Sequence, residues 1–381
     1  MKGTRAEIYL DALKHNFLHM RDWIPQDVKI AGIVKANAYG HDLVTIAKAL
    51  VDLGVDYLGV AMMAEARAIR RHEPNIPILI MGRVFETDYD EAIKLNITLT
   101  ISSAEEARRL NLSASLDEKK VKVHLKFDSG FNRLGFKTTE DVIDALEEIQ
   151  GYDYIEVEGL FTHLALKDVD SDEEQFRKFD SLLATIADKG WHIPIKHACD
   201  SIGAVAYPNN SYSMVRLGAI LYGYCSRKTP FKLKPVMHFK TNITRIVSIK
   251  AGEGVGYDYT FVADRPSFIG TIPVGYADGL PRNLSNKGFV TVHGKPAKIV
   301  GLMCMDQCMI DLTDHLASDQ DAVQVGDEVI LFDDMSPNLT EVAECAMTNR
   351  NELLTRIALR VPRIILQLED KPKIIQYLDF L

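Results

Sequence analysis

The chain has 381 residues, of which 47% are hydrophobic and 25% are charged, and its formal net charge is −9. This length and composition predict about two domains of a globular enzyme, and the acidic balance gives no reason to expect a nucleic-acid partner. No signal peptide opens the chain and no apolar run reaches the roughly 20 residues of a membrane span, so we expect a cytoplasmic protein, or the cytosolic domain of a membrane-anchored one.

The first part of the chain alternates short apolar segments with amphipathic ones. Eight segments rich in β-branched residues are predicted strands: Lys29–Lys35, Tyr57–Ala61, Ile78–Gly82, Thr98–Ser102, Val121–Asp128, Ile155–His163, Ile193–His197 and Met214–Gly218. Predicted helices between them include Leu43–Leu53, Ala64–Arg71, Glu105–Leu112, Thr139–Ile149 and Ser171–Lys189. This alternation predicts a (β/α)8 barrel. An open doubly wound sheet is the alternative, but no Gly-x-Gly-x-x-Gly follows the first strand.

Near Lys234-Pro235 the pattern changes to alternating strands separated by turn residues. The predicted strands are Lys240–Ile249, Ser267–Pro273, Gly288–His293, Lys298–Gly301, Met309–Leu312 and Glu328–Leu331, followed by helices over Glu341–Arg350 and Glu352–Arg360. We therefore expect a barrel over residues 1–233 and a mostly antiparallel β domain over 234–381, with the first strand segment free to pair with the second domain. Five scattered cysteines favour a reducing compartment, and Cys304 and Cys308 lack the further ligands of a metal site.

Lys35 stands at the end of the first apolar strand, where burial lowers the pKa of an amine and lets it form an imine. The alternative is a lysine that reaches out to water. The motif Val34-Lys35-Ala36-Asn37-Ala38-Tyr39-Gly40-His41 resembles the pyridoxal-phosphate lysine motif of the alanine racemase family, and the resemblance extends over nearly the whole chain. It implies pyridoxal 5'-phosphate as cofactor, with Lys35 as the Schiff-base residue, in a racemase acting on a small amino acid.

The resemblance also implies how the cofactor is held. The phosphate-contacting positions of the family match Tyr39, Ser201, Gly218 and Ala219. Arg216 matches the arginine beside the pyridine nitrogen; because it stays charged, it leaves that nitrogen unprotonated and limits the lifetime of a carbanion. His197 resembles the residue that orients this arginine, and His163 one that packs by the ring.

Two further barrel residues match positions near the substrate. Arg133 matches an arginine near the cofactor's phenolic oxygen and the substrate carboxylate, and the alternative is a surface ion-pair partner. Lys126 matches a position that is a carbamylated lysine in some family members. A carbamate there would be an anion able to brace Arg133.

The β domain is expected to supply the second half of the site, because inverting a stereocentre needs acid–base groups on both faces of the α-carbon. Gly254-Val255-Gly256-Tyr257 resembles the segment with the catalytic tyrosine, so Tyr257 is expected to face Lys35. The motifs around Tyr276, and around Met305 and Asp306, match segments at the substrate entrance. In the family this tyrosine reaches the barrel of a partner subunit, which implies a head-to-tail homodimer with composite active sites.

Asn351 departs from the family, whose members usually have a tyrosine there that lines the substrate pocket. A carboxamide enlarges the pocket and adds hydrogen-bonding capacity, so we expect serine as well as alanine to be racemised, with D-amino acids passing to cell-wall precursors. The same substitution resembles the serine racemases of glycopeptide-resistance systems. Asp200 and Leu217 are lesser departures.

The alternatives to a racemase are a pyridoxal-phosphate decarboxylase of this architecture, although the chain lacks any Gly-Gly, and a non-catalytic pyridoxal-phosphate binder.

Overall fold

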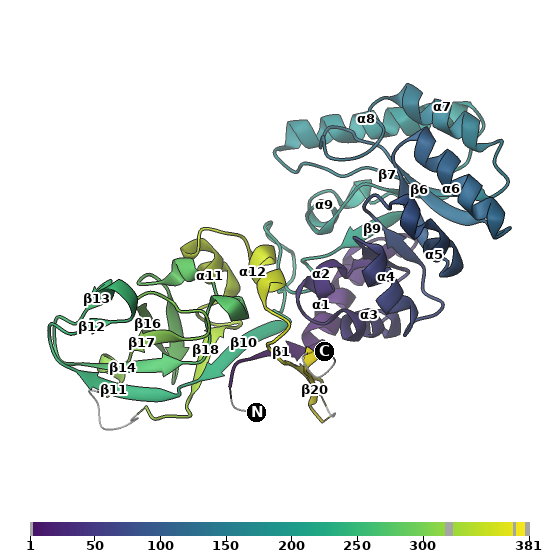
Figure 1. Cartoon of the computed structure of the whole chain (residues 1–381). Coiled ribbons are helices and arrows are strands. Elements are labelled where there is room, and N and C mark those ends of the chain that lie inside the picture. Colours follow the sequence, from purple (N-terminus) through teal and green to yellow (C-terminus); the bar gives the residue numbers. More distant parts are fainter. Residues whose placement is uncertain (1–2, 317–322, 369–370, 378–381) are drawn as a thin grey trace.

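The chain folds into two lobes, which Figure 1 shows side by side. This computed structural model describes residues 3–316, 323–368 and 371–377. A parallel sheet with surrounding helices forms one lobe, and a mostly antiparallel sheet forms the other. Strand β1 (Arg5–Tyr9) and helix α12 (Arg350–Arg356) lie where the lobes meet. Among the described residues, no helix combines the length and the apolar character that crossing a membrane requires.

Eight parallel strands form the barrel, which confirms the fold class predicted from the sequence. They are β2 (Lys29–Ile33), β3 (Tyr57–Val60), β4 (Ile78–Ile80), β5 (Thr98–Ile101), β6 (Val121–Lys126), β7 (Ile155–Phe161), β8 (Ile195–His197) and β9 (Met214–Leu217). Neighbours pair in chain order, and β9 returns to pair with β2. Backbone bonds from Ser213 N to Lys196 O (3.1 Å) and from Arg216 N to Cys199 O (3.0 Å) link the β8 and β9 segments.

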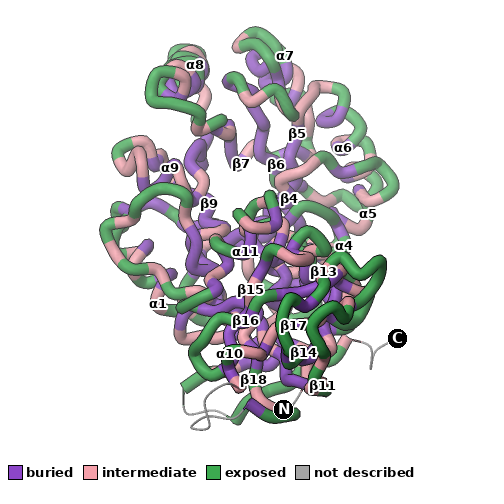
Figure 2. The backbone as a smooth tube through the Cα atoms, turned by 90° about the vertical axis from the view of Figure 1, so that its left-hand side faces the viewer, coloured by how far each residue is buried: buried purple, intermediate pink, exposed green. Residues whose placement is uncertain are grey.

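Helices cover the outside of these strands (Figure 1). They are α1 (Leu10–Trp23), α3 (Leu43–Asp52), α4 (Met63–Arg70), α5 (Tyr89–Lys94), α6 (Ala104–Leu116), α7 (Thr139–Ile149), α8 (Val169–Asp188) and α9 (Ser201–Ala206). Their inner faces are apolar, as Val142, Leu146 and Ile149 of α7 illustrate, and these faces cover the buried strands (purple in Figure 2). Because helices cover the sides of the barrel, polar side chains can gather at the carboxyl ends of its strands.

The second lobe is a ten-stranded sheet in the order β11-β14-β17-β16-β15-β18-β10-β1-β19-β20. Its strands after β1 are β10 (Met237–Asn242), β11 (Arg245–Ile249), β14 (Ser267–Ile272), β15 (Phe289–Val292), β16 (Lys295–Val300), β17 (Cys308–Asp311), β18 (Glu328–Phe332), β19 (Arg363–Leu366) and β20 (Lys373–Ile375). A separate ribbon pairs β12 (Gly254–Val255) with β13 (Phe261–Val262). Helices α10 (Thr313–Leu316), α11 (Leu339–Cys345) and α12 complete this lobe.

The predicted strand Lys240–Ile249 was wrong, because two strands occupy this range. Ile243 N donates to Asp327 O and Thr244 N donates to Thr271 O, each at 2.9 Å, so adjacent residues bond to different neighbours. This change of partner ends β10 and begins β11. The first strand of the chain, β1, lies between β10 and β19 and so belongs to the second sheet.

Candidate active site

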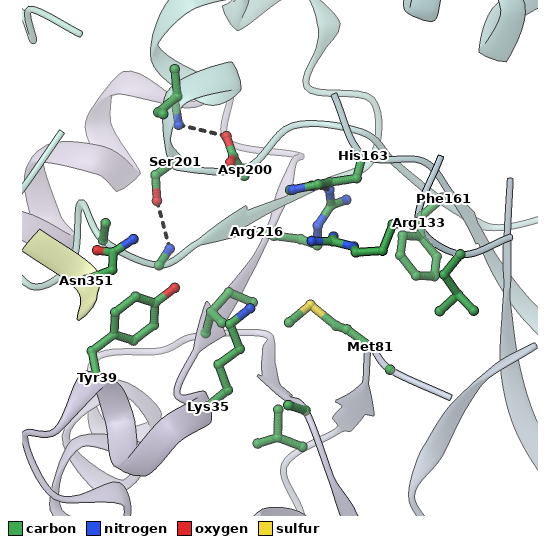
Figure 3. Close-up of a pocket in the computed structure, with 18 of the residues that line it drawn as sticks. Lys35, Tyr39, Met81, Arg133, Phe161, His163, Asp200, Ser201, Arg216 and Asn351 are labelled. Carbon is green, nitrogen blue, oxygen red and sulfur yellow. Dashed lines mark hydrogen bonds between the residues drawn. The ribbon is translucent and has the colours of Figure 1, made fainter. Parts of the chain in front are cut away.

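A cavity of about 450 Å³ opens at the carboxyl ends of the barrel strands. Ten of the predicted site residues line it: Lys35, Tyr39, Lys126, Arg133, His163, Ser201, Arg216, Gly218, Ala219 and Asn351. Figure 3 shows Lys35 and Tyr39 projecting from one side, with Arg216 and His163 facing them. The cavity therefore combines several cationic or neutral basic groups with few carboxylates, an arrangement suited to an anionic ligand.

The segment that carries Lys35 is a left-handed turn, α2 (Lys35–Tyr39), rather than the end of the predicted strand. Ala36 to Tyr39 all have φ between 52° and 54°, a conformation that costs an L-residue roughly 1–2 kcal/mol. Side chains far along the chain hold the turn: Arg363 Nε donates to Gly40 O at 3.0 Å, and Tyr377 Oη donates to Asp42 at 2.6 Å. The turn directs both Lys35 and Tyr39 into the cavity (Figure 3).

The surroundings of Lys35 disfavour its protonated form. Burial lowers its pKa, and the nearby cations Arg133 and Arg216 lower it further. A neutral amine is the form that attacks a carbonyl carbon. The cavity thus favours covalent attachment of a carbonyl compound at Lys35.

The opposite wall contains a small cradle around Gly218. Its N–H donates to Ser201 Oγ at 2.8 Å, and a Cβ at Gly218 would lie 2.6 Å from the Tyr39 hydroxyl. Only glycine leaves room for that hydroxyl. Asp200, the departure noted in the sequence, accepts from Ile202 N at 2.9 Å and Gly203 N at 3.0 Å and so caps α9. This cap places Ser201 in the first turn of α9, where a phosphate is favourably bound.

Arg216 lies at the far end of the cavity and is only 4% exposed. Its guanidinium donates to His197 Nδ1 at 2.8 Å, to Ala198 O at 2.7 Å and to Thr162 O at 3.0 Å, and it contacts His163 Nδ1 at 3.1 Å. Burial lowers the pKa of Arg216 to about 10, so it remains a cation at neutral pH. Burial and the nearby arginines lower the pKa of His163 to about 2, which keeps that ring neutral.

Lys126 lies beside these groups at the end of β6. Its amine donates to Phe127 O at 2.7 Å and lies 5.4 Å from the centre of the Phe161 ring. Burial, with help from Arg216, lowers the pKa of Lys126 to about 7. Arg133 is exposed and stacks on Phe131 at 4.3 Å. The Lys126 amine is therefore partly neutral near pH 7. The Arg133 guanidinium lines the cavity and is exposed, so it can bind a ligand.

Four predicted residues of the β domain, unlike Asn351, do not line this cavity within one chain. Tyr257, Tyr276 and Met305 are 67%, 45% and 57% exposed, and Asp306 is exposed as well. They lie on three packed loops, which we call the platform: Gly254–Tyr259, Gly275–Asp278 and Gly301–Asp306. Ala277 N donates to Met305 O at 2.8 Å, and a Cβ at Gly301 would lie 2.6 Å from Val255 O. In Figure 1 the ribbon β12–β13, next to Tyr257, is at the far end of the β domain from the barrel.

Both lobes match known protein families. The family model described as "Alanine racemase, N-terminal domain" matches residues 8–226, and the one described as "Alanine racemase, C-terminal domain" matches residues 236–365. The chain belongs to the alanine racemase family. "Alanine racemase 2" of Caldanaerobacter subterraneus is 39% identical over 374 residues, which cover 96% of this chain and 95% of that protein.

Solved structures of alanine racemases share the whole fold. The alanine racemase of Clostridium difficile 630 superposes with a TM-score of 0.93 at 34% identity and covers 99% of both chains. That of Bartonella henselae, described with covalently bound pyridoxal phosphate, has a TM-score of 0.87 at 27% identity and covers 96% of this chain and 100% of its own. The lysine, the cradle and the arginine thus lie in an alanine racemase barrel.

Two buried polar residues behind the cavity were not predicted from the sequence. His124 on β6 contacts His197 at 2.9 Å, and Glu158 on β7 lies beside His124. Both residues are buried. The available signal was a histidine in the apolar run Val121–Asp128, at a position where a barrel strand normally has an aliphatic residue.

Proposed function

We propose that this chain is a pyridoxal-phosphate-dependent racemase that interconverts the L- and D-forms of alanine and serine. The single observation that carries the proposal is the convergence of Lys35, the Gly218 cradle and Arg216 on one cavity in an alanine racemase fold. Each of the three suits a different part of the cofactor.

The residues fit this cofactor at three points. Tyr39, Ser201 and the backbone of Gly218 and Ala219 would hold the phosphate, because Gly218 lets the Tyr39 hydroxyl approach its backbone closely and a helix begins beside it. Lys35 would hold the aldehyde carbon. Arg216 would donate to the pyridine nitrogen, and His197, which accepts from Arg216, would keep it aimed there. When bound, the cofactor supplies the electron sink that makes the substrate's α-proton acidic.

Racemisation then needs two proton-transfer groups on opposite faces of the α-carbon. The Lys35 amine would remove or return the proton on one face. The Tyr257 hydroxyl would serve the other face, with Arg133 binding the substrate carboxylate. Because Tyr257 lies far from Lys35 in its own chain, the proposal requires a second copy that places its platform over the barrel.

The assembly we propose is therefore a head-to-tail homodimer in which each barrel is completed by the partner's platform. Its support is the exposure of Tyr257, Tyr276 and Met305, which would be buried over the cavity mouth. Asp306 would lie at the same entrance. We further propose a cytoplasmic location and a supply of D-amino acids to cell-wall precursors.

The purified chain should be tested with the cofactor added. We expect a yellow Lys35-dependent absorbance, exchange of the α-proton of L-alanine and L-serine with deuterated solvent, and appearance of the D-enantiomers. The Lys35→Ala variant should lose all three signals. Release of carbon dioxide would favour the decarboxylase, and cofactor binding without α-proton exchange would favour a non-catalytic binder; either result would overturn the proposal.

A further inference from the structure

Arg216 is a buried cation without an ion-pair partner among the described residues, although the charge of the nearby Asp200 carboxylate raises its pKa. Its guanidinium contacts two imidazoles and two backbone carbonyls, and no carboxylate of the described residues is in ion-pair contact with it. An uncompensated charge of this kind is costly inside a protein unless dipoles or a connected counter-charge stabilise it. A series of side-chain contacts leads from Arg216, away from the cavity, to such a counter-charge.

The direction of those hydrogen bonds is fixed by Arg216, which can only donate. His197 Nδ1 accepts from it at 2.8 Å, so the proton of the neutral His197 ring must be on Nε2. That Nε2 lies 2.9 Å from His124 Nδ1, which must therefore accept. The proton of His124 is then on Nε2, which faces Glu158 Oε2 at 3.5 Å. At this distance the two atoms are in electrostatic contact, and neither has a hydrogen-bond partner in the described chain.

Glu158, at the end of this series of contacts, is an anion. Burial opposes its ionisation, but the neighbouring His124 and Lys122 side chains outweigh burial and lower its pKa to about 2. Lys122 reaches Glu158 Oε1 at 2.5 Å from the exposed side of β6. A carboxylate that is charged at every physiological pH is thus linked to the buried arginine through two neutral rings.

A glycine on β7 leaves space for the His124 ring. His124 pairs with Gly159 across β6 and β7, and a Cβ at Gly159 would lie 2.5 Å from His124 Nδ1. Any larger residue at position 159 would displace the His124 ring. Phe161 then packs face to face on His197, with ring centres 4.6 Å apart and planes 2° apart. Both imidazoles are consequently fixed in position, and both are fully buried.

We propose that His124 and Glu158 are positioning residues for Arg216, acting through His197 to set the direction of every proton from the cavity to the base of the barrel. In this arrangement Glu158 is a remote counter-charge that helps to keep the Arg216 guanidinium aimed into the cavity. For the proposed reaction, the electron sink would stay weak only while the guanidinium points at the ring nitrogen, a consequence that rests on the proposed function. The arrangement of protons itself does not depend on that function.

The proton positions can be measured without turnover. In the apo protein labelled with ¹⁵N-histidine, long-range ¹H–¹⁵N spectra should show His197 and His124 as neutral rings protonated at Nε2 from pH 6 to 9. Assignment would come from His197→Gln and His124→Gln variants. A His197 ring protonated at Nδ1, or at both nitrogens, would overturn the proposal whether or not the enzyme is active.

Two substitutions of Glu158 separate positioning from packing. Glu158→Gln keeps an acceptor oxygen for the His124 N–H, whereas Glu158→Met keeps the volume and removes the acceptor. Loss of the contact between His124 and a charged acceptor should lower kcat of the Met variant roughly tenfold with little change in KM. The Gln variant should recover most of that loss. Lys122→Met, which removes the other partner of Glu158 and leaves the acceptor for His124, is the matched control and should stay within about twofold of wild type.

Thermal unfolding of each variant identifies any that fail to fold. If folded Glu158→Met and Glu158→Gln variants both match wild type in kcat, or if both lose activity equally, His124 and Glu158 do not position Arg216. Absence of racemisation by the wild-type chain would instead refute the proposed function, and the nitrogen spectra would still decide the proton positions.

Discussion

Asn351 is the residue that separates serine from alanine in the proposed reaction. It lines the cavity from α12, beside Tyr39 (Figure 3). In Asn351→Tyr, an aromatic ring would fill the space and remove the carboxamide that can bond a serine hydroxyl. We expect kcat/KM for serine to fall roughly tenfold more than that for alanine. Thr355→Val, one turn along α12 and outside the cavity lining, is the control. An unchanged serine-to-alanine ratio would contradict this role of Asn351.

Lys126 is the second residue with a testable chemical state. Because burial lowers its pKa to about 7, the fraction of neutral amine rises as pH increases from 6 to 8. Carbon dioxide adds to a neutral amine with loss of one proton, giving a carbamate anion. With ¹³C-bicarbonate we expect a carbamate ¹³C resonance that grows over this pH range and disappears in Lys126→Ala.

Lys137 provides the comparison for Lys126, because its exposed amine pairs with Asp128 at 2.9 Å. The Lys137→Ala variant should therefore keep the carbamate signal. A wild-type spectrum without that signal, or one that survives the loss of Lys126, would show that Lys126 stays a simple amine.

At the scale of elements, the left-handed turn α2 depends on the C-terminal end of the chain. Tyr377 Oη donates to Asp42 at 2.6 Å and accepts from Asn37 at 3.1 Å. Tyr377→Phe removes both bonds while keeping the ring, and should lower the free energy of unfolding by about 1–3 kcal/mol. It should also weaken cofactor affinity, because Lys35 and Tyr39 are on the loosened turn. Thermal unfolding and titration of the apo protein with cofactor measure the two effects.

Tyr212 gives a matched control, since its hydroxyl donates to Asp180 at 2.8 Å away from the cavity. Tyr212→Phe should lose stability without a change in cofactor affinity. Equal cofactor affinities in the two variants would mean that the end of the chain stabilises the fold but does not position the turn.

The same turn shows what the sequence could and could not predict. Lys35 was predicted from its place at the end of an apolar strand, and Tyr39 and Arg216 from their resemblance to motifs of the alanine racemase family. The left-handed backbone of α2 was not predicted, because Ala36 and Ala38 carry no local signal for positive φ. Contacts from Arg363 and Tyr377 impose it from more than 300 positions away.

Long-range pairing also limited the prediction of strands. The split of Lys240–Ile249 into β10 and β11 depends on which neighbours accept the N–H groups of Ile243 and Thr244. The place of β1 beside β19 depends on a strand at the other end of the chain. Local patterns decide whether a segment is extended, whereas its partners are decided by the tertiary fold.

At the scale of the whole molecule, one chain holds the two proposed bases at separate ends. Lys35 lines the barrel cavity, while Tyr257 is 67% exposed on the platform of the other lobe. If sites form between chains, Lys35→Ala and Tyr257→Phe should each be severely impaired alone, with the loss of Tyr257 costing at least roughly 100-fold in kcat. The two defects would then lie in different copies and could complement each other.

Mixing the two inactive variants tests this arrangement directly. After equal amounts are dissociated and reassembled, half of the dimers should be hybrids, and each hybrid should have one site with both native residues. Activity should therefore return to about one quarter of wild type, one half of the dimers times one half of their sites. If Lys35 and Tyr257 acted within one chain, every site in the mixture would lack one base, and mixing would restore nothing.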